Sequence, residues 1–264
     1  MDMTGKTVLV TGSASGIGRA TVLRLAKYGA ARIACLDLHD ESNAVTVEAL
    51  RDLGVEALAV SVDLGEVAQI RAAFATVFAA FGRLDAAALI GGYSWRGETL
   101  DVTEAQWDRV TDVNLRGTFF CCQEALKIMY PQGSGAIVTM SADAAFWPIA
   151  GYAVQAAAKG GIANMTRALA LETARRGVRV NAVSPGITKL APTGVSRPPE
   201  PPLNREGFPL ADSFETMVDR TAGGRWMKPD EVADAIVYLA SDAASGVNGD
   251  LLFINGGGYF TLNF

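Results

Sequence analysis

Residues 8–18 read Val-Leu-Val-Thr-Gly-Ser-Ala-Ser-Gly-Ile-Gly, and this stretch decides the fold. The apolar run at residues 7–10 predicts a buried strand, and residues 19–27 have the spacing of a helix. The turn between them carries three glycines, Gly12, Gly16 and Gly18. Glycine lets the backbone turn tightly and lets a pyrophosphate approach the bare amides at a helix N-terminus, where the helix dipole favours anions. The stretch therefore predicts a dinucleotide site rather than an ordinary turn.

An acidic residue ends the next predicted strand, residues 32–36. This residue, Asp37, lies about 20 residues past the glycines. A carboxylate there accepts hydrogen bonds from both adenosine ribose hydroxyls of NAD and repels a 2′-phosphate. Leu38 and His39 follow it, rather than an arginine, so we expect NAD and not NADP. The competing interpretation, an aspartate that caps a helix, suits Asp40 better than Asp37.

The chain has 264 residues, 50% of them hydrophobic, and a net charge of -5, which suits one domain with a large core. The acidic balance argues against a nucleic-acid partner, because no basic stripe is present to meet phosphates. No apolar run is as long as a membrane span, and the N-terminus has no apolar leader region. We therefore expect a cytoplasmic protein. Scattered cysteines and a single histidine, His39, argue against a metal site and a Ser-His-Asp triad.

Strand and helix signals alternate along the chain. They predict an α/β fold, a Rossmann-type doubly wound parallel sheet of about seven strands with helices on both faces. Further strands are expected at residues 57–62, 84–90, 135–140, 178–183 and 251–254, and helices at 67–81, 103–129, 152–175 and 229–240. Residues 190–224 contain several prolines and interrupt the alternation of strand and helix signals. A long connection in a compact domain is usually functional or disordered, and we expect a substrate lid.

Taken together, these residues resemble the short-chain dehydrogenase/reductase family in its compact single-domain form, over essentially the whole chain, 1–264. The likeness rests on the glycine turn and Asp37, and also on Asp63, Asn114, Lys159, Asn181, Pro185-Gly186, Arg225, residues 229–233 and Asn255-Gly256-Gly257. By resemblance, Asp63 and Leu64 flank the adenine, Lys159 binds the nicotinamide ribose, and residues 185–188 pass the nicotinamide. The full implied cofactor set is Gly12, Ser13, Ser15, Gly16, Ile17, Gly18, Asp37, Leu38, Asp63, Leu64, Gly91, Lys159, Pro185, Gly186, Ile187 and Thr188.

The proton-transfer half of the family pattern is largely absent. The family's chemistry needs a tyrosine four residues before the lysine, so that the lysine lowers the phenol pKa and the phenol passes a proton. The register set by Lys159-Gly160-Gly161 and by residues 166–170 puts Gln155 there, and an amide cannot titrate. The family's serine falls on Ala142. Its Asn-Asn-Ala-Gly stretch reads Leu89-Ile90-Gly91-Gly92.

Two residues near Gln155 are candidates for the missing acid. Tyr152, three residues earlier, is expected about one turn along the same helical face, although a core or substrate-pocket tyrosine fits that position too. Asp143 directly follows the position of the missing serine, and its alternative interpretation is a solvated loop acid. Ser141 is expected to point away from the site. The expected catalytic set is Asn114, Gln155, Lys159, Tyr152 and Asp143, with no metal.

Three functions fit this altered site, and the intact cofactor motif favours the first. In the first, an NAD(H)-dependent oxidoreductase moves a hydride to or from a carbonyl, alcohol or imine, and the proton passes through Tyr152, Asp143 or water. In the second, a redox-neutral isomerase, dehydratase or cyclase holds a bulky apolar substrate against residues 89–95 and 146–148, unless those aromatics are plain core. In the third, the protein binds NAD without catalysis.

The resemblance also implies a homo-oligomer, a tetramer or a dimer, built through two long helices and the C-terminal strand region. The alanine-rich face of residues 152–175 and the apolar tail 259–264 fit such an assembly. The same tail could instead close its own subunit.

Overall fold

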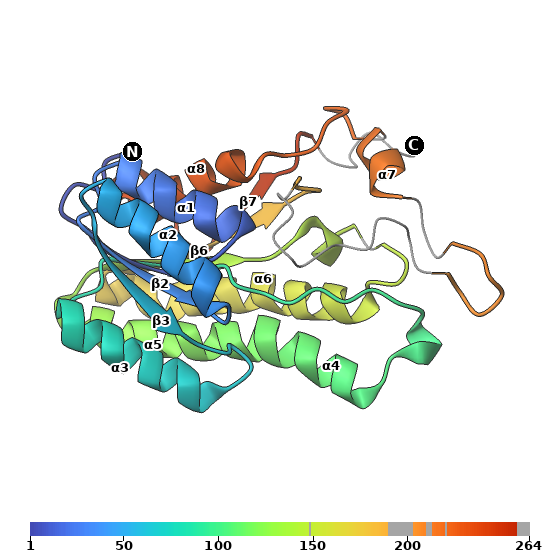
Figure 1. Ribbon diagram of the computed structural model, residues 1–264, viewed down its shortest axis with the longest axis horizontal. Coiled ribbons are helices and arrows are strands. Elements are labelled where there is room, and N and C mark those ends of the chain that lie inside the picture. Colours follow the sequence, from blue (N-terminus) through green and yellow to red (C-terminus); the bar gives the residue numbers. More distant parts are fainter. Residues whose placement is uncertain (148, 190–202, 210–212, 220, 258–264) are drawn as a thin grey trace.

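The computed structural model describes residues 1–147, 149–189, 203–209, 213–219 and 221–257. One sheet forms its centre, with a layer of helices on each face (Figure 1). The strands are β1 (Thr7–Thr11), β2 (Arg32–Asp37), β3 (Glu56–Ser61), β4 (Ala86–Leu89), β5 (Gly135–Met140), β6 (Val178–Pro185) and β7 (Leu251–Ile254). The main helices are α1 (Gly16–Lys27), α2 (Asp40–Asp52), α3 (Val67–Phe81), α4 (Glu104–Thr111), α5 (Gly117–Gln132), α6 (Ala153–Thr173), α7 (Phe214–Asp219) and α8 (Pro229–Ala240).

The seven strands run parallel in the order β3-β2-β1-β4-β5-β6-β7. Val8 of β1 pairs with Ile33 of β2 on one side and with Ala86 of β4 on the other. The strand order therefore reverses at β1, and in sheets of this kind ligands bind in the crevice beyond the carboxyl ends of the strands at that point. The predicted fold class, a single α/β domain of Rossmann type, is confirmed.

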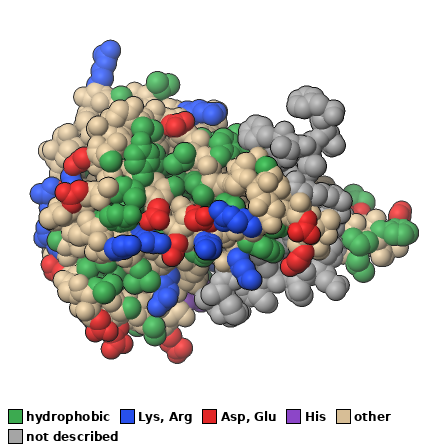
Figure 2. All heavy atoms as spheres, turned by 90° about the horizontal axis from the view of Figure 1, so that it is seen from above, with side chains coloured by type: hydrophobic (Ala, Val, Ile, Leu, Met, Phe, Trp, Pro, Cys, Tyr) green, Lys and Arg blue, Asp and Glu red, His purple; other side chains and the backbone are tan. Residues whose placement is uncertain are grey.

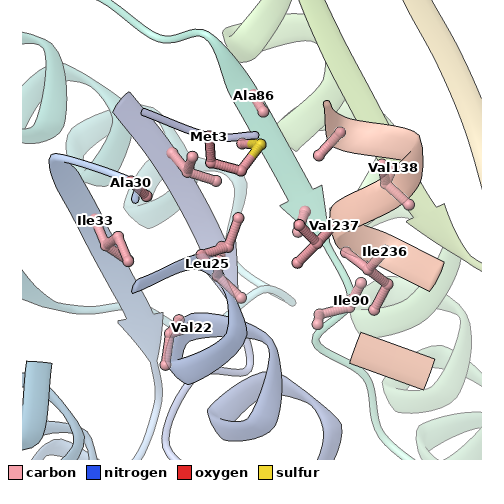
Figure 3. Packing of buried hydrophobic residues seen from close by; sticks show 14 of the residues in the cluster. Met3, Val22, Leu25, Ala30, Ile33, Ala86, Ile90, Val138, Ile236 and Val237 are labelled. Carbon is pink, nitrogen blue, oxygen red and sulfur yellow. The ribbon is translucent and has the colours of Figure 1, made fainter. Parts of the chain in front are cut away.

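Two hydrophobic cores hold the layers together. On one face, α1, α2 and α8 pack on the sheet, and Figure 3 shows Val22 and Leu25 of α1 and Ile236 and Val237 of α8 in that core. On the other face, α3, α5 and α6 bury apolar side chains such as Phe74 against the same strands. Because both faces are covered, strands such as β1 and β4 are buried at every residue, as expected for a parallel sheet.

Several boundaries differ from the sequence-based expectation. The strand expected at 84–90 is confined to Ala86–Leu89, and α2 was not predicted. The helix expected at 103–129 is interrupted by a π-helical turn at Asp112–Arg116. The helix expected at 152–175 starts at Ala153 and gives way to a short 3-10 turn at Ala174–Arg176.

The expected lid, 190–224, lies partly outside the described residues, as do Pro148 and the tail 259–264. Its described parts are a short hairpin closed by a bridge from Leu203 to Pro209, and α7. Among the described residues no helix is both long enough and apolar enough to span a membrane. On the face seen in Figure 2, acidic and basic side chains are interspersed over the surface.

Candidate cofactor site and active site

The glycine turn between β1 and α1 forms a bare backbone cradle. Gly12 and Gly16 have φ values of 73° and 51°, which L side chains rarely adopt. A Cβ on Gly12 would lie 2.8 Å from Gly91 Cα, and one on Gly18 would overlap the Gly12 carbonyl oxygen. The N-cap residue Ser15 makes no side-chain capping bond, and the first turn of α1 has no acidic residue. The first backbone N–H groups of α1 therefore remain available to an anion.

Asp37 ends β2 with its carboxylate buried beside this turn. Oδ2 accepts a hydrogen bond from the Ala14 N–H and Oδ1 from the His39 N–H, both at 2.9 Å. A carboxylate has about four lone-pair sites, so acceptor capacity remains for hydroxyl groups. The Ser13 hydroxyl donates to Asn43 Oδ1, and Asn43 donates to the Cys35 carbonyl, so these side chains hold the turn in place. Leu38, on the outer side, is 48% exposed.

Asp63, just beyond β3, is held by a residue that the sequence reasoning missed. Arg109 of α4 donates to both Asp63 carboxylate oxygens at 2.9 Å, and the Gly65 N–H donates to Oδ1. Burial acts to raise the Asp63 pKa, but the Gly65 and Arg109 hydrogen bonds outweigh it and hold the pKa below its usual value. The Tyr93 ring lies 5.7 Å from the Arg109 guanidinium. Asp63 and Arg109 are 46 positions apart in the chain, so no local spacing in the sequence predicts their contact.

The loop after β4 lies between Asp63 and the glycine turn. Thr11 Oγ1 accepts hydrogen bonds from the N–H groups of Ile90 and Gly91. A Cβ on Gly91 would lie 2.7 Å from the Leu64 side chain and 3.1 Å from the Gly12 nitrogen. Leu64, Gly91 and Gly12 thus meet at the carboxyl ends of β1, β3 and β4.

Residues 185–188 leave β6 at the same sheet edge. The Gly186 N–H donates to the Ile254 carbonyl of β7, and the Thr188 hydroxyl donates to the Gly186 carbonyl at 3.0 Å. A β-bridge joins Thr188 to Met227, and the backbone of Ile187 accepts from the Met227 N–H. This fixes the path of the segment across the mouth of the site.

Lys159 and Asn114 converge on the bare backbone of Gly92. A Cβ on Gly92 would lie 2.6 Å from Asn114 Oδ1 and 3.6 Å from Lys159 Nζ. Asn114 lies in the π-helical turn, and its Nδ2 donates to the carbonyls of Val110 and Tyr93 at 2.8 and 2.7 Å. A π turn shifts the backbone hydrogen bonds back by one residue, which frees a carbonyl for a side chain. The Asn114 amide oxygen is buried and has no hydrogen-bond partner among the described residues.

Gln155 lies on α6 one turn before Lys159, as the sequence spacing predicts. It is 8% exposed, and its Oε1 is buried without a hydrogen-bond partner in the part of the chain that the structure describes. Ala142 follows β5 in extended conformation and supplies only a methyl group. The Ser141 hydroxyl donates to the backbone carbonyl of Lys159 at 2.9 Å, so it ties β5 to α6.

Tyr152 and Asp143, the two candidate acids, lie in different surroundings. Tyr152 is the N-cap of α6 rather than a residue inside it, and Arg96 lies over its ring at 5.3 Å. It lines a surface pocket of about 430 Å³ beside Leu100 and Ile149. Asp143 is 7% exposed, so the interpretation as a solvated loop acid is wrong. Its Oδ1 accepts from the Ser184 hydroxyl at 3.3 Å, and burial raises its pKa to about 6 despite the Asn255 and Ser184 side chains.

The apolar segment at residues 146–147 packs on β7. The rings of Phe146, Trp147 and Phe253 lie 5.3 to 6.0 Å apart in tilted and edge-on pairs. The two aromatic residues thus lie beside the edge strand, with Phe146 37% exposed.

Comparison with known proteins places this geometry in a family. A family profile described as enoyl-(acyl carrier protein) reductase matches residues 12–259. The cis-4-hydroxycyclohexanecarboxylate dehydrogenase of Sinomonas cyclohexanicum is 39% identical over 96% of this chain and 96% of its own. The chain belongs to the short-chain dehydrogenase/reductase family. The D-threitol dehydrogenase of Mycolicibacterium smegmatis is 36% identical, covering 96% of this chain and 92% of that relative.

The solved structures agree. The crystal structure of levodione reductase matches this short-chain dehydrogenase/reductase with a TM-score of 0.85 and 30% identity, over 97% of this chain and 98% of that one. These relatives are oxidoreductases, and dehydrogenases of the family typically use a nicotinamide dinucleotide, NAD or NADP. The cradle fits such a group on its own geometry, because it combines φ values reserved for glycine with uncapped N–H groups at α1.

Proposed function

We propose that the protein is an NAD(H)-dependent oxidoreductase that transfers a hydride to or from a carbonyl, alcohol or imine of a fairly apolar small molecule. The observation that carries this proposal is the convergence of Lys159 and Asn114 over Gly92, at the sheet edge that also holds the glycine turn. The oxidoreductase relatives support the same reaction class.

Each residue of the cofactor set has a role in this proposal. The N–H groups of the turn, residues 12–18, would bind the pyrophosphate, and Asp37 with Leu38 would bind the adenosine ribose. Asp63, Leu64 and Gly91 would enclose the adenine, while Lys159 and residues 185–188 would hold the nicotinamide half. Once bound, the nicotinamide would supply or accept the hydride. The protein's part is to place the substrate carbon and to manage the proton.

The substrate would enter through the pocket beside Tyr152. Its lining is largely apolar, with Leu100, Ile149, Ala153 and Ala156 among its residues. Two amides would orient the reacting group: Gln155 would donate a hydrogen bond to it, and the Asn114 oxygen would accept one from it. We also propose that residues 190–224 act as a lid over this entrance.

The test is a fluorescence titration of NADH into the pure protein, followed by a panel of ketones, cyclic imines and alcohols. Binding of NADH in the micromolar range and its consumption with one panel member are the expected results. If NADH binds and is never oxidised by any member, while NAD⁺ is never reduced, the oxidoreductase proposal is wrong.

The preference for NAD rests on Asp37. Asp37→Ala is expected to weaken NADH binding at least about tenfold, because the ribose hydroxyls lose their charged acceptor. Asp40→Ala, which removes an exposed carboxylate three residues later, is the matched control and is expected to leave the affinity unchanged. A melting temperature for each variant separates lost binding from lost folding. Retained NADH affinity in a folded Asp37→Ala protein would contradict the assignment.

A redox-neutral reaction on the same fold is the second candidate. It is favoured by one observation, the amide of Gln155 one turn before Lys159, where a group that cannot titrate lies beside the reacting position. Conversion of a substrate with no net change in NADH absorbance would support this function over the first. Binding of NADH without any conversion would leave the non-catalytic alternative.

Assembly completes the proposal. We propose a cytoplasmic homodimer or homotetramer that uses the long helices, among them α6, where Leu171 is 84% exposed. Light scattering on the native protein measures its mass directly, and a monomer at micromolar concentration would contradict this assignment.

A further inference from the structure

Lys159 brings a titratable group to the centre of the active site. Its side chain is buried on α6, and its Nζ donates to the Met140 carbonyl at the end of β5, at 2.9 Å. Among the described residues this carbonyl is its only hydrogen-bond acceptor. An ammonium carries three N–H donors, so two remain, one for the nicotinamide ribose assigned to Lys159 above and one for a further ligand.

Lys159 Nζ and Asn114 Oδ1 lie on the same side of Gly92. Lys159 Nζ and Asn114 Oδ1 lie 3.6 and 2.6 Å from the point that a Cβ on Gly92 would occupy. Gly92 itself is exposed, so a ligand can approach it from solvent. A substrate oxygen beside these two side chains would accept a hydrogen bond from Lys159, and a hydroxyl or water beside them would donate to the unpartnered Asn114 oxygen. Both contacts favour a reacting oxygen next to Lys159 and Asn114.

The other candidate groups face elsewhere. Gln155 has no proton to give, the Tyr152 ring lies under Arg96 at the start of α6, and Asp143 is bound to Ser184 of β6. Within the oxidoreductase function proposed above, we propose that Lys159 itself gives the proton to the substrate oxygen in reduction and removes it in oxidation.

The step balances. When a hydride adds to the carbonyl carbon, the C=O π pair moves onto oxygen as an alkoxide. One N–H bond of the Lys159 ammonium breaks and an O–H bond forms, which leaves a neutral amine and an alcohol. The amine regains its proton from solvent, so one proton is taken up for each carbonyl reduced. Oxidation of the alcohol runs the same steps backwards, with the neutral amine as the base.

The surroundings suit this role. Burial lowers the pKa of Lys159 to about 8, close to the pH at which an acid and base works best near neutrality. The buried and half-buried charged groups on the elements packed against α6 have partners elsewhere. Asp143 faces Ser184, Arg109 faces Asp63, Arg179 faces the carbonyls of Ser241 and Val247, and Asp112 pairs with Arg116. The remaining charged groups on α4 and on the turn after α6 are exposed, namely Glu104, Asp108, Arg175 and Arg176.

The test compares native protein with Lys159→Arg, using the substrate found with the panel above. Arginine keeps the charge and the N–H donors but cannot give up its proton, so NADH affinity by fluorescence is expected to stay within about tenfold. Turnover is expected to fall about 10²–10⁴-fold. For the native protein, kcat/KM for reduction is expected to fall above a pH of about 8 and that for oxidation to rise up to it.

A measurement without turnover locates the group responsible. Acetylation of each lysine by a trace of acetic anhydride, mapped by mass spectrometry across pH, gives the titration of Lys159 separately from that of the others. The pH at which half of Lys159 has lost its proton is expected to match the pH at which kcat/KM changes. Lys127→Arg, at an exposed lysine paired with Glu124, is the matched control and is expected to keep both rate and profile.

The outcomes separate the two proposals. Turnover that survives in Lys159→Arg, or a rate limb that vanishes in Tyr152→Phe or Asp143→Asn instead, would overturn the role of Lys159 and leave the oxidoreductase function standing. A native protein that binds NADH but never consumes it would overturn both. The inference would also be overturned if Lys159 titrated at a pH far from the one at which kcat/KM changes.

Discussion

Asp143 shows how one side chain couples folding to pH. It lies buried between β5, β6 and the start of the C-terminal segment, with Oδ2 3.2 Å from the point that a Cβ on Gly186 would occupy. Burial raises its pKa from 3.8 to about 6. Between those values the folded protein holds a proton that the unfolded chain has released, so this group stabilises the fold below pH 4 and loses that contribution as pH rises to about 6.

Asp143→Asn is therefore expected to flatten the pH dependence of stability between about pH 4 and 6. An amide needs no proton to remain neutral, and its oxygen still accepts from the Ser184 hydroxyl. At pH 7 the variant is expected to be more stable by up to about 3 kcal/mol, the free energy of a shift of roughly two pKa units. Urea unfolding at a series of pH values measures this. Asp52→Asn, at an exposed carboxyl on α2, is expected to keep the native profile, and an equal profile for both variants would contradict the argument.

The residue scale is also where sequence reasoning reached its limits. The spacing of Gln155 and Lys159 on one helix is local, and the structure keeps it. The surroundings of Tyr152 and Asp143 depend on Arg96 and Ser184, which other elements contribute. A pattern along the chain reports which residues share a helical face. It does not report which side chain from another element will occupy the space beside them.

At the scale of elements, the junction of β1 with α1 depends on two backbones in contact. A methyl on Gly18 would overlap the Gly12 carbonyl oxygen, whereas one on Gly160, in α6, would meet nothing within 4 Å. Both positions are helical, so alanine gains similar helix propensity at each. The two substitutions therefore separate the cost of the contact from the gain in propensity.

Gly18→Ala is expected to destabilise the protein by about 3 kcal/mol, the upper range for overpacking a rigid contact. Gly160→Ala is expected to stabilise it by about 1 kcal/mol. Urea unfolding of both variants at neutral pH measures the difference, and NADH titration shows whether the turn still binds. Equal stability of the two variants would show that the close approach carries no energetic weight.

Most of the elements could be predicted, for physical reasons that also explain the exceptions. The short, largely apolar runs at 135–140 and 251–254 predicted β5 and β7 with correct bounds, and the long stretches of helical spacing did the same for α3 and α8. The helix α2 is more polar, and two of its four buried residues, Asn43 and Thr46, carry polar side chains, so it was not predicted. The π turn at Asp112–Arg116 has no sequence signal, because its extra residue is stabilised by the Asn114 side chain bonding to Val110 and Tyr93.

At the scale of the whole molecule, Arg205 joins segments that are 104 positions apart. Its side chain donates to Asp101 Oδ1 at 2.8 and 3.0 Å and to the Leu100 carbonyl, while its backbone N–H donates to Glu98. Glu98 and Leu100 line the pocket beside Tyr152. Arg205 thus fastens part of the proposed lid to the pocket wall.

Arg205→Ala is expected to speed hydrogen exchange at residues 98–101 and 203–209 without lowering the melting temperature, because the contact lies at the surface. The KM for the substrate is expected to rise more than kcat falls, since the pocket wall loses its anchor. Lys127→Ala removes an exposed lysine that pairs with the buried Glu124 of α5, and it serves as the control. Unchanged exchange in both segments would count against the fastening role.

The place of β1 in the middle of the sheet has a consequence for how the chain is made. β1 is synthesised before both of its neighbours in the sheet: β2 follows at Arg32, whereas β4 begins only at Ala86. Until then a nascent chain carries Val8, Leu9 and Val10 along an unpaired strand edge, which is a template for another chain to add to. This edge of β1 can therefore close only after residues 86–89 have been synthesised.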